Sequence, residues 1–350
     1  MHFSADTMFP GDLFDAASRF AAASSTGNST RRDAWGQAVA MGWPALLVGE
    51  ARGGAGGTLA DLGAVLEGCA RHALGLPLVR RCALAPALLM AANNAAADDV
   101  LRALCAAEID LDVADGNALT VTPLPDGGVR LGGVLEQVDA ELPFTHVLVA
   151  AGEHLLLLPR SALPAPAARY AGIDGTAGTD IALDGTVLPA AAVLLAGVQA
   201  RSAAATAEDL AMLVTAIEMA AMLGATVEHC IVHLNTRRQF GVALSTFQVL
   251  RHKVVDLYVQ FESASVLLAR LVHDTVASGQ LARRDAALCK LYLDDLARHA
   301  AESAIQLHGG MGMTAELPAA RLACRLLCAE FEHGDRLQQL ARLQRLPAPT

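Results

Sequence analysis

The sequence predicts an α+β fold in three consecutive parts: an N-terminal α-helical domain, a small middle β domain and a C-terminal antiparallel four-helix bundle. Three observations carry this prediction. Apolar residues recur at helical spacing over residues 1–107, and short β-prone segments separated by turn residues fill 108–200. Long amphipathic stripes joined by short loops then occupy 201–350. We therefore expect domains at 1–107, 108–200 and 201–350.

Composition narrows the class of protein. The chain has 350 residues, of which 53% are hydrophobic and 18% charged, which is typical of a globular protein with a large core. Aromatic residues make up only 4%, so alanine, leucine and valine must fill that core. The net charge of -10 argues against a nucleic-acid surface.

Several targeting and metal signals are not seen. No stretch reaches the roughly 20 apolar residues of a membrane span, and the first residues lack the pattern of a secretory signal. The seven cysteines form no Cys-x-x-Cys pair, and Cys324 and Cys328 have no second pair at a matching spacing. We expect free thiols in a reducing cytoplasm, and no metal site.

The N-terminal part reads as helices. Leu13, Phe14 and Ala17 follow helical spacing, and a glycine-rich loop at 49–57 precedes a helix that Thr58 is expected to cap. The loop has neither the ending of a P-loop nor the spacing of a dinucleotide fingerprint, so it is interpreted as a structural turn. Further helices are expected at 83–93 and 98–107.

The middle and C-terminal parts divide as follows. Strands are expected at 118–123, 129–131, 145–150, 154–159, 180–183 and 186–188, forming a small barrel or sandwich. Helices are expected over 210–234, 245–276, 283–307 and 319–343.

Two motifs in the last part suggest a ligand site. Gln306-Leu-His-Gly-Gly-Met-Gly-Met-Thr314 ends a helical pattern with glycines, which permit either a turn or a close approach to the backbone. Upstream stands Arg237-Arg-Gln-Phe-Gly241. Taken alone, the first motif is a helix stop and turn with an amide side chain nearby.

The three-part order and these motifs together resemble the acyl-CoA dehydrogenase family. The resemblance covers nearly the whole chain. It includes Trp35 and the Gly53-Gly54-x-Gly56 loop, Arg237-x-Gln239-Phe240-Gly241, and Gln306-x-x-Gly309-Gly310-x-Gly312 with Lys290 before it.

The resemblance implies a cofactor and a reaction. Family members hold FAD, and they remove two hydrogens from Cα and Cβ of an acyl-CoA thioester with a carboxylate as base. Electrons then pass to an electron-transfer flavoprotein or a similar acceptor. The resemblance assigns Arg237, Gln239, Phe240, Gln306, Gly309 and Gly310 to the pyrophosphate and adenosine end of an FAD whose ring sits in the neighbouring subunit. An arginine fork suits a pyrophosphate, and glycines let backbone N–H groups approach it.

The sequence departs from the family in the middle domain. Flavin-holding members carry a Thr-Glu-Pro-x-x-Gly-Ser-Asp segment, but residues 118–128 here contain no Gly-Ser-Asp. Residues 136–140 also lack the aromatic residue that covers the flavin ring in the family.

The catalytic base is the second departure. The family's usual glutamate position is held by His333, Glu332 stands one residue earlier, and the alternative family position falls on Ala211. Three explanations stay open: Glu332 is the base, with a pKa raised by burial; His333 is the base; or this chain supplies none.

These departures favour a partner chain. The sequence resembles the non-catalytic subunit of bacterial heterotetrameric acyl-CoA dehydrogenases that act on steroid side chains, in which one chain lends FAD-tail contacts to the other. Two alternatives remain. One is a self-sufficient homo-oligomer that uses Glu332 or His333, and the other is a redox-inactive protein that binds CoA thioesters or acts as a scaffold.

Overall fold

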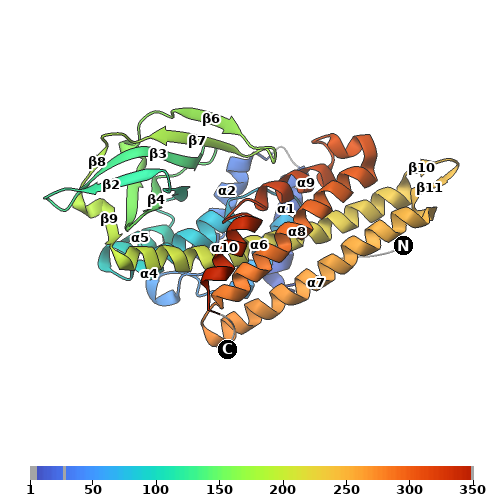
Figure 1. Ribbon diagram of the computed structural model, residues 1–350, viewed down its shortest axis with the longest axis horizontal. Helices are drawn as coiled ribbons and strands as arrows, with labels where there is room; N and C mark the ends of the chain where they lie inside the picture. Colours follow the sequence, from blue (N-terminus) through green and yellow to red (C-terminus); the bar gives the residue numbers. More distant parts are fainter. Residues whose placement is uncertain (1–5, 27–28, 348–350) are drawn as a thin grey trace. The chain divides into compact units, whose positions relative to one another are not determined.

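A computed structural model describes residues 6–26 and 29–347, and it has the predicted order of helices, strands and helices (Figure 1). The chain forms two compact units. One comprises the described residues of Met1–Asn28, Leu59–Gly75 and Met212–Thr350, and the other comprises Ser29–Thr58 and Leu76–Ala211. The helices expected within residues 1–107 are thus shared between the bundle and the sheet.

The bundle unit is built from long helices. They are α1 (Asp12–Thr26), α3 (Leu59–Ala70), the latter part of α6 (Val198–Thr236), α7 (Gln248–Ser278), α8 (Arg283–His308), α9 (Pro318–Ala329) and α10 (Arg336–Arg345). The inner stripe of α7 includes Leu257, Phe261 and Leu268, which are fully buried. A Cβ at Gly224 of α6 would lie 2.7 Å from the Phe261 ring, so this glycine lets the aromatic ring pack against the helix backbone.

The fourth helix is not continuous, so the expectation of one helix over 319–343 is wrong. α9 ends at Ala329 and α10 begins at Arg336, with Asp335 and Gln338 forming a capping box. Between them, His333 and Gly334 have φ angles of 57° and 96°. Two successive residues of positive φ cannot continue a right-handed helix, although the apolar spacing resumes beyond them.

The length of α6 corrects a second expectation. By length and composition alone, Val198–Thr236 is sufficient to cross a membrane, contrary to the prediction that no such stretch exists. Within the protein, 94% of its most apolar window is buried, which is also the property of a core helix in a bundle.

The other unit is a sheet flanked by helices. Its helices are α2 (Arg31–Ala40), α4 (Ala85–Ala92) and α5 (Ala95–Cys105). Its strands are β1 (Leu111–Asp115), β2 (Leu119–Pro123), β3 (Val129–Asp139), β4 (His146–Ala151), β5 (His154–Pro159), β6 (Ala168–Ala171), β7 (Ala177–Ala182), β8 (Val187–Leu188) and β9 (Val193–Ala196). They form one nine-stranded sheet in the order β6-β7-β3-β1-β4-β5-β9, with β2 and β8 also paired to β3.

β1 was not predicted from the sequence. It pairs in parallel with β4, and four of its five residues are buried. Val147 and Leu156 contribute to a core within the sheet domain, whereas Leu111 and Leu148 pack with Leu88 of α4 in a second cluster. Two of the five residues of β1 are aspartates, which are depleted in strands, so its composition gives no clear strand signal.

Short helical turns complete the fold. They are η1 (Trp43–Ala45), η2 (Glu50–Arg52), the π-helical η3 (Val79–Leu84), η4 (Arg160–Ala162), η5 (Ala190–Ala192), η6 (Leu244–Thr246) and η7 (Gly309–Met313); a two-stranded hairpin, β10 (Arg238–Gln239) and β11 (Val242–Ala243), follows α6. The glycine-rich loop at 49–57 is a structural turn, as predicted. A Cβ at Gly54 would lie 2.1 Å from the Val48 carbonyl oxygen, and one at Gly57 would lie 2.9 Å from that of Leu46.

Candidate functional site

The hairpin after α6 presents three of the residues assigned to the FAD tail. Arg237 leads into β10, Gln239 pairs with Val242 across the hairpin, and Phe240 and Gly241 form its tip. The tip residues have φ angles of 53° and 81°, the left-handed conformation of a two-residue hairpin turn. Phe240 is 89% exposed, so the chain holds an aromatic ring in solvent.

The end of α8 presents the other three. Gln306 is exposed in the last turn of α8, and Gly309 and Gly310 are exposed in the 3₁₀ turn η7 that follows. Gly309 needs a positive φ of 61°, but Gly310 does not, and a Cβ there would meet nothing within 4 Å. Packing within the described chain therefore does not explain Gly310, whereas a close approach from outside would.

Two histidines bring these segments together. His233 lies one turn before Arg237 on α6, and its ring centroid is 4.4 Å from that of His308, the last residue of α8. The Arg237 amide also donates to the His233 carbonyl. The two motifs thus lie at one end of the bundle, as a shared ligand site requires. We call Arg237–Phe240, Gln306 and Gly309–Gly310 the tail face.

The polar side chains of the tail face fit an FAD tail. Within residues 6–26 and 29–347, the side chains of Arg237, Gln239 and Gln306 make no hydrogen bond or ion pair. A free guanidinium is a bidentate donor for a pyrophosphate, and free amides can read the edge of a nucleotide. The donor set and the open glycine backbone match the group that the sequence motif implied.

Two histidines near the tail face have lowered pKa values, which favours their uncharged forms. Burial lowers the pKa of His233, and the adjacent His308 and Arg237 lower it further. Burial likewise lowers the pKa of His229, one turn earlier on α6, with Glu228 opposing this effect and His308 adding to it.

Glu332, the first candidate base, is engaged by an arginine. The Arg325 guanidinium donates to both oxygens of Glu332, at 2.5 and 3.0 Å, and to both oxygens of Glu218, at 3.2 and 2.8 Å. Burial alone would lower the pKa of Arg325, but the two carboxylates outweigh it and hold the pKa well above its ordinary value. A carboxylate bound at both oxygens by a guanidinium is a poor proton acceptor, so this contact opposes the role of Glu332 as base.

His333, the second candidate, lies in the connection between α9 and α10. It is half-buried, with φ at 57°, and its carbonyl accepts a hydrogen bond from the Gln339 side chain at 2.8 Å. The neighbouring Gly334 carbonyl accepts from Gln339 at 3.1 Å and from Lys290 at 3.4 Å. Side chains of α8 and α10 thus hydrogen-bond to the backbone of the segment that carries both candidates.

Lys290 of α8 makes the most deeply buried of these contacts. It is 0% exposed, and its Nζ donates to Asp294 Oδ1 at 2.5 Å and to the Glu330 carbonyl at 3.0 Å. Burial raises the pKa of Asp294 to about 6, although the Lys290 ammonium opposes that shift. The family-like lysine therefore has a structural role here, because it ties the end of α9 to α8.

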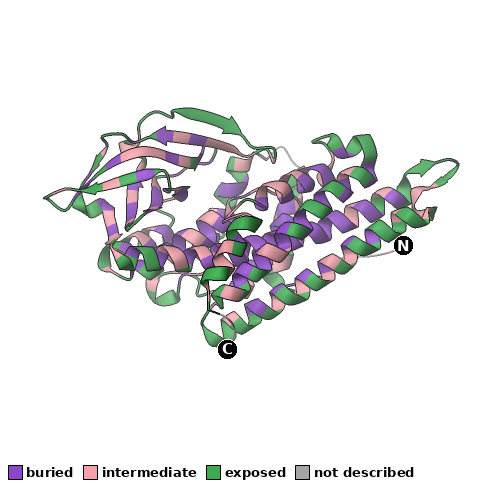
Figure 2. Cartoon of the chain, in the orientation of Figure 1, coloured by how far each residue is buried: buried purple, intermediate pink, exposed green. Residues whose placement is uncertain are grey.

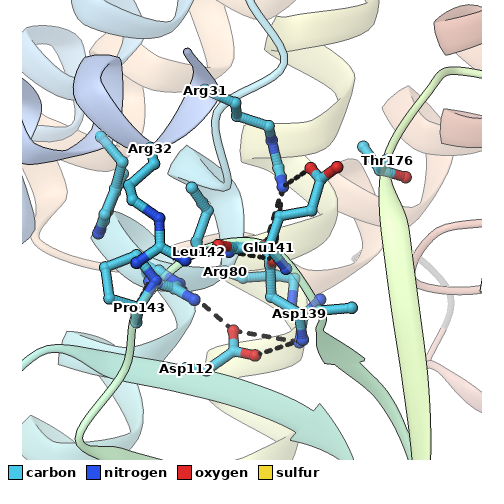
Figure 3. Close-up of polar contacts among 12 residues, drawn as sticks. Arg31, Arg32, Arg80, Asp112, Asp139, Glu141, Leu142, Pro143 and Thr176 are labelled. Atoms are coloured by element: carbon cyan, nitrogen blue, oxygen red, sulfur yellow. Dashed lines mark hydrogen bonds and ion pairs between the residues drawn. The ribbon is translucent and has the colours of Figure 1, made fainter. Parts of the chain in front are cut away.

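A cluster of ion pairs lies at the end of β3 (Figure 3). This end is one of the two segments in which the sequence lacks the family's flavin-ring residues. Residues 118–128 form β2 and the turn after it, beside β3, whereas residues 136–139 end β3 at a bulge where Gln137 has a φ of 59°. Arg80 of η3 donates to the carbonyls of Gln137, at 2.9 Å, and of Val113.

Buried carboxylates complete the cluster. Arg80 and Arg81 both pair with the fully buried Asp112, at 3.3 and 3.4 Å. Asp112 also accepts from the Asp139 amide at 2.8 Å, and Arg31 pairs with Asp139 at 3.1 Å (Figure 3). These contacts tie η3 and α2 to β1 and β3, so the charged groups at this place serve the fold.

Metal chemistry finds no support among the residues that the structure describes. They include no group of three histidine, cysteine or acidic side chains placed to hold an ion. Cys324 and Cys328 are half-buried on α9 and take part in no disulfide.

Sequence reasoning missed the two residues that most affect the candidates. Arg325 was not singled out, although it precedes Glu332 by seven residues in the sequence. His233 was not singled out, although a histidine one turn before the Arg237 motif, paired with the one inside the Gln306 motif, would have linked the two segments.

Comparisons with known proteins agree with this architecture. Residues 202–345 match the family model described as acyl-CoA dehydrogenase, C-terminal domain. The chain is 29% identical over 280 residues to acyl-CoA dehydrogenase IpdE2 of Mycobacterium tuberculosis, covering 79% of this chain and 74% of that protein.

Solved structures share the fold over nearly the whole chain. A variant of the Tcur3481-Tcur3483 steroid ACAD matches with a TM-score of 0.80 and 24% identity, covering 95% of this chain and 96% of that one. A chain of the ChsE4-ChsE5 complex from Mycobacterium tuberculosis matches with a TM-score of 0.82 and 20% identity, covering 99% and 100%.

Proposed function

Because residues 202–345 match the model for the acyl-CoA dehydrogenase C-terminal domain and the chain resembles acyl-CoA dehydrogenase IpdE2, we propose that it is a member of this family and a subunit of an FAD-dependent enzyme that introduces an α,β double bond into an acyl-CoA thioester. Within that enzyme it is the partner chain: its tail face binds the pyrophosphate and adenosine end of an FAD whose reactive ring is held by a related subunit. The similarity to a steroid ACAD and to a complex of two named chains supports a heterotetramer acting on a steroid side-chain acyl-CoA.

One contrast carries this proposal. The side chains of Arg237, Gln239 and Gln306 are exposed and make no hydrogen bond or ion pair to the described residues, whereas the candidate base Glu332 is held at both oxygens by Arg325. Exposed tail residues suit either a homo-oligomer or a partner chain, but a chain that worked alone would also need a base that is free to take a proton.

The residues divide the binding work. Arg237 suits the pyrophosphate as a charged fork, the amides of Gln239 and Gln306 suit polar edges, and the open backbone at Gly310 admits close approach. When bound, FAD supplies the acceptor for the hydride removed from the acyl chain. We further propose that the complex passes electrons to an electron-transfer flavoprotein or a similar acceptor, and that it works in the cytoplasm, where its seven free cysteines would stay reduced.

Flavin stoichiometry tests the proposal. The chain is expressed alone and together with an acyl-CoA dehydrogenase-like chain encoded beside it, and bound FAD is measured by absorbance per mole of protein. We expect a colourless chain alone and one FAD per heterodimer in the complex. In the complex, Arg237→Ala should release FAD, whereas Glu332→Gln should retain both FAD and turnover.

Other outcomes identify the rival functions. A yellow protein that oxidises acyl-CoA when expressed alone, and loses activity with Glu332→Gln or His333→Ala, would establish a self-sufficient enzyme. Absence of flavin under every condition would instead indicate a CoA-thioester-binding or scaffold protein.

A further inference from the structure

Each motif of the tail face is joined to one histidine of a contacting pair. His233 on α6 lies one turn before Arg237, and His308 directly precedes Gly309. His233 is half-buried and His308 is buried, with their ring centroids 4.4 Å apart. Figure 2 shows that the hairpin beyond them is mostly exposed. The pair therefore lies where the buried helices meet the exposed residues assigned to the FAD tail.

The rings of this pair can take up a proton. His308 Nδ1 lies 2.8 Å from the Ala304 carbonyl oxygen, and because a carbonyl only accepts, Nδ1 carries a hydrogen. His308 Nε2 is then the nitrogen that can bind a further proton. The His233 ring makes no hydrogen bond within residues 6–26 and 29–347, so one of its nitrogens is also available to a proton in the neutral ring.

Charges around the pair disfavour protonation in the free chain. Burial lowers the pKa of His233, and His308 and Arg237 lower it further. Two charged rings at the distance of this pair would repel each other, so the pair does not hold two protons. Other charged or titratable groups lie on the segments around it: His72, Glu228, His229, Arg238, residues 251–253, Glu302 and Arg321. Glu228 favours the charged form of the neighbouring His229, whereas Arg321 and His72 oppose it.

An FAD tail would change this balance of charge. The two phosphates of a pyrophosphate each carry about one negative charge at neutral pH, and one arginine fork balances only one of them. The tail face has two arginines, but Arg238 donates to the Gly241 carbonyl of its own hairpin at 3.5 Å. Arg237 alone makes no side-chain hydrogen bond to the described residues. A remaining negative charge near the histidine pair would favour its protonated form.

We propose that the pair His233–His308 takes up one proton when the FAD tail binds, and thereby supplies a second positive charge to the site. This inference rests on the proposed function, because it takes the FAD tail as the ligand. The proton comes from solvent and returns there when the tail leaves. Because the bound state holds more protons than the free state, FAD affinity rises as pH falls through the range in which the pair titrates.

Calorimetry on the co-expressed complex tests the proton uptake. FAD is removed and titrated back at about pH 7 in Mops and in Tris, whose different heats of ionisation report the protons bound. We expect uptake of about one proton per FAD, and a dissociation constant that rises by up to about tenfold per pH unit between about pH 6.5 and 8. His233→Asn/His308→Asn should abolish both effects, whereas His273→Asn, at an exposed position on α7, should change neither.

A fixed charge gives a second measurement, which does not require both histidines to be removed. In His233→Lys, a cation is present at every pH in this range, so FAD binding should release or take up almost no proton. Its dissociation constant at about pH 8 should equal that of the wild type at about pH 6.5 within about threefold. Circular dichroism and the mass of the complex confirm folding and assembly of each variant.

The outcomes separate this proposal from the FAD assignment. Proton uptake that is the same in His233→Asn/His308→Asn and the wild type, or a wild-type pH dependence in His233→Lys, overturns the role of the histidine pair. Arg237→Ala should weaken FAD binding at every pH, because the arginine fork does not titrate in this range. Unchanged FAD binding in Arg237→Ala would reject the tail face itself. Weaker binding there, together with unchanged uptake in the histidine variants, would reject only the proton uptake.

Discussion

Arg325 binds Glu332 through both carboxylate oxygens, and the same guanidinium binds both oxygens of Glu218. One cation from α9 therefore joins α6 to the segment after α9. The contact explains how a glutamate can stand beside the family's base position and yet serve the fold.

Arg325→Leu should destabilise the protein by about 3 kcal/mol, because it leaves two carboxylates facing each other with no counter-charge. The loss is measured by chemical denaturation at pH 7.5. It should shrink at pH 5, because carboxylates freed from the guanidinium take up protons more readily. Glu332→Gln is the matched control and should cost less than about 1 kcal/mol, since Glu218 still pairs with Arg325. Equal losses in the two variants would contradict a shared arginine.

Lys290→Met should cost about 3 kcal/mol or more, because it leaves Asp294 buried without its cation and removes the donor to the Glu330 carbonyl. Adding Asp294→Leu should recover part of this loss, since the unpaired carboxylate is then gone. Denaturation of the two single variants and the double variant measures the coupling. Strictly additive losses would show that the two side chains do not act as a pair.

The long helices were predictable and their interruption was not. α8 was expected at 283–307 and spans Arg283–His308, because its apolar stripe is unbroken and Gly309 ends it. The connection between α9 and α10 was hidden, because apolar residues keep helical spacing on both sides and the decisive feature is a backbone angle at His333. β1 was missed because two of its five residues are aspartates, a residue type depleted in strands, and the arginines that pair with Asp112 are distant in sequence.

The sequence predicted which segments form the candidate site, but not whether its charged side chains are paired. The glycine and arginine motifs predicted the tail-face residues by type, and this assignment stays a prediction. The ring contact between His233 and His308 shows that both segments lie at one end of the bundle. Whether Glu332 was free or paired depended on the position of Arg325 in space. Sequence spacing alone does not report which helical arginine turns toward which carboxylate.

Acid should loosen the end of the bundle that carries the tail face. Burial, with His308 nearby, holds the pKa of His229 and His233 below the ordinary histidine value. The unfolded chain therefore binds more protons below about pH 6.5 than the folded chain does, so this part of the stability is present above that pH and is lost as pH falls.

Melting temperatures between pH 5.5 and 8 test this sign. The wild type should lose stability toward pH 5.5, and His229→Asn/His233→Asn should reduce the slope. Comparing the doubly substituted protein with the wild type isolates the contribution of these two histidines to the pH dependence from that of the other titrating groups. A slope that is unchanged in that variant would assign the acid sensitivity elsewhere.

Phe240 should matter to assembly and not to folding. Its left-handed φ of 53° costs about 1 kcal/mol for a residue other than glycine, and its edge contact with Phe247, at 6.1 Å between centroids, contributes a similar amount. Phe240→Gly should therefore change the free energy of unfolding of the isolated chain by less than about 1 kcal/mol.

In the complex, Phe240→Gly removes an aromatic ring that is 89% exposed on the free chain, and affinity for the related subunit should fall at least about tenfold. Titration calorimetry measures the affinity of Phe240→Gly and of the control Ile173→Ala, which truncates a side chain exposed elsewhere and should leave affinity unchanged. Because strain and ring contact offset each other only in the free chain, a loss of stability matching the loss of affinity would assign Phe240 to the fold instead.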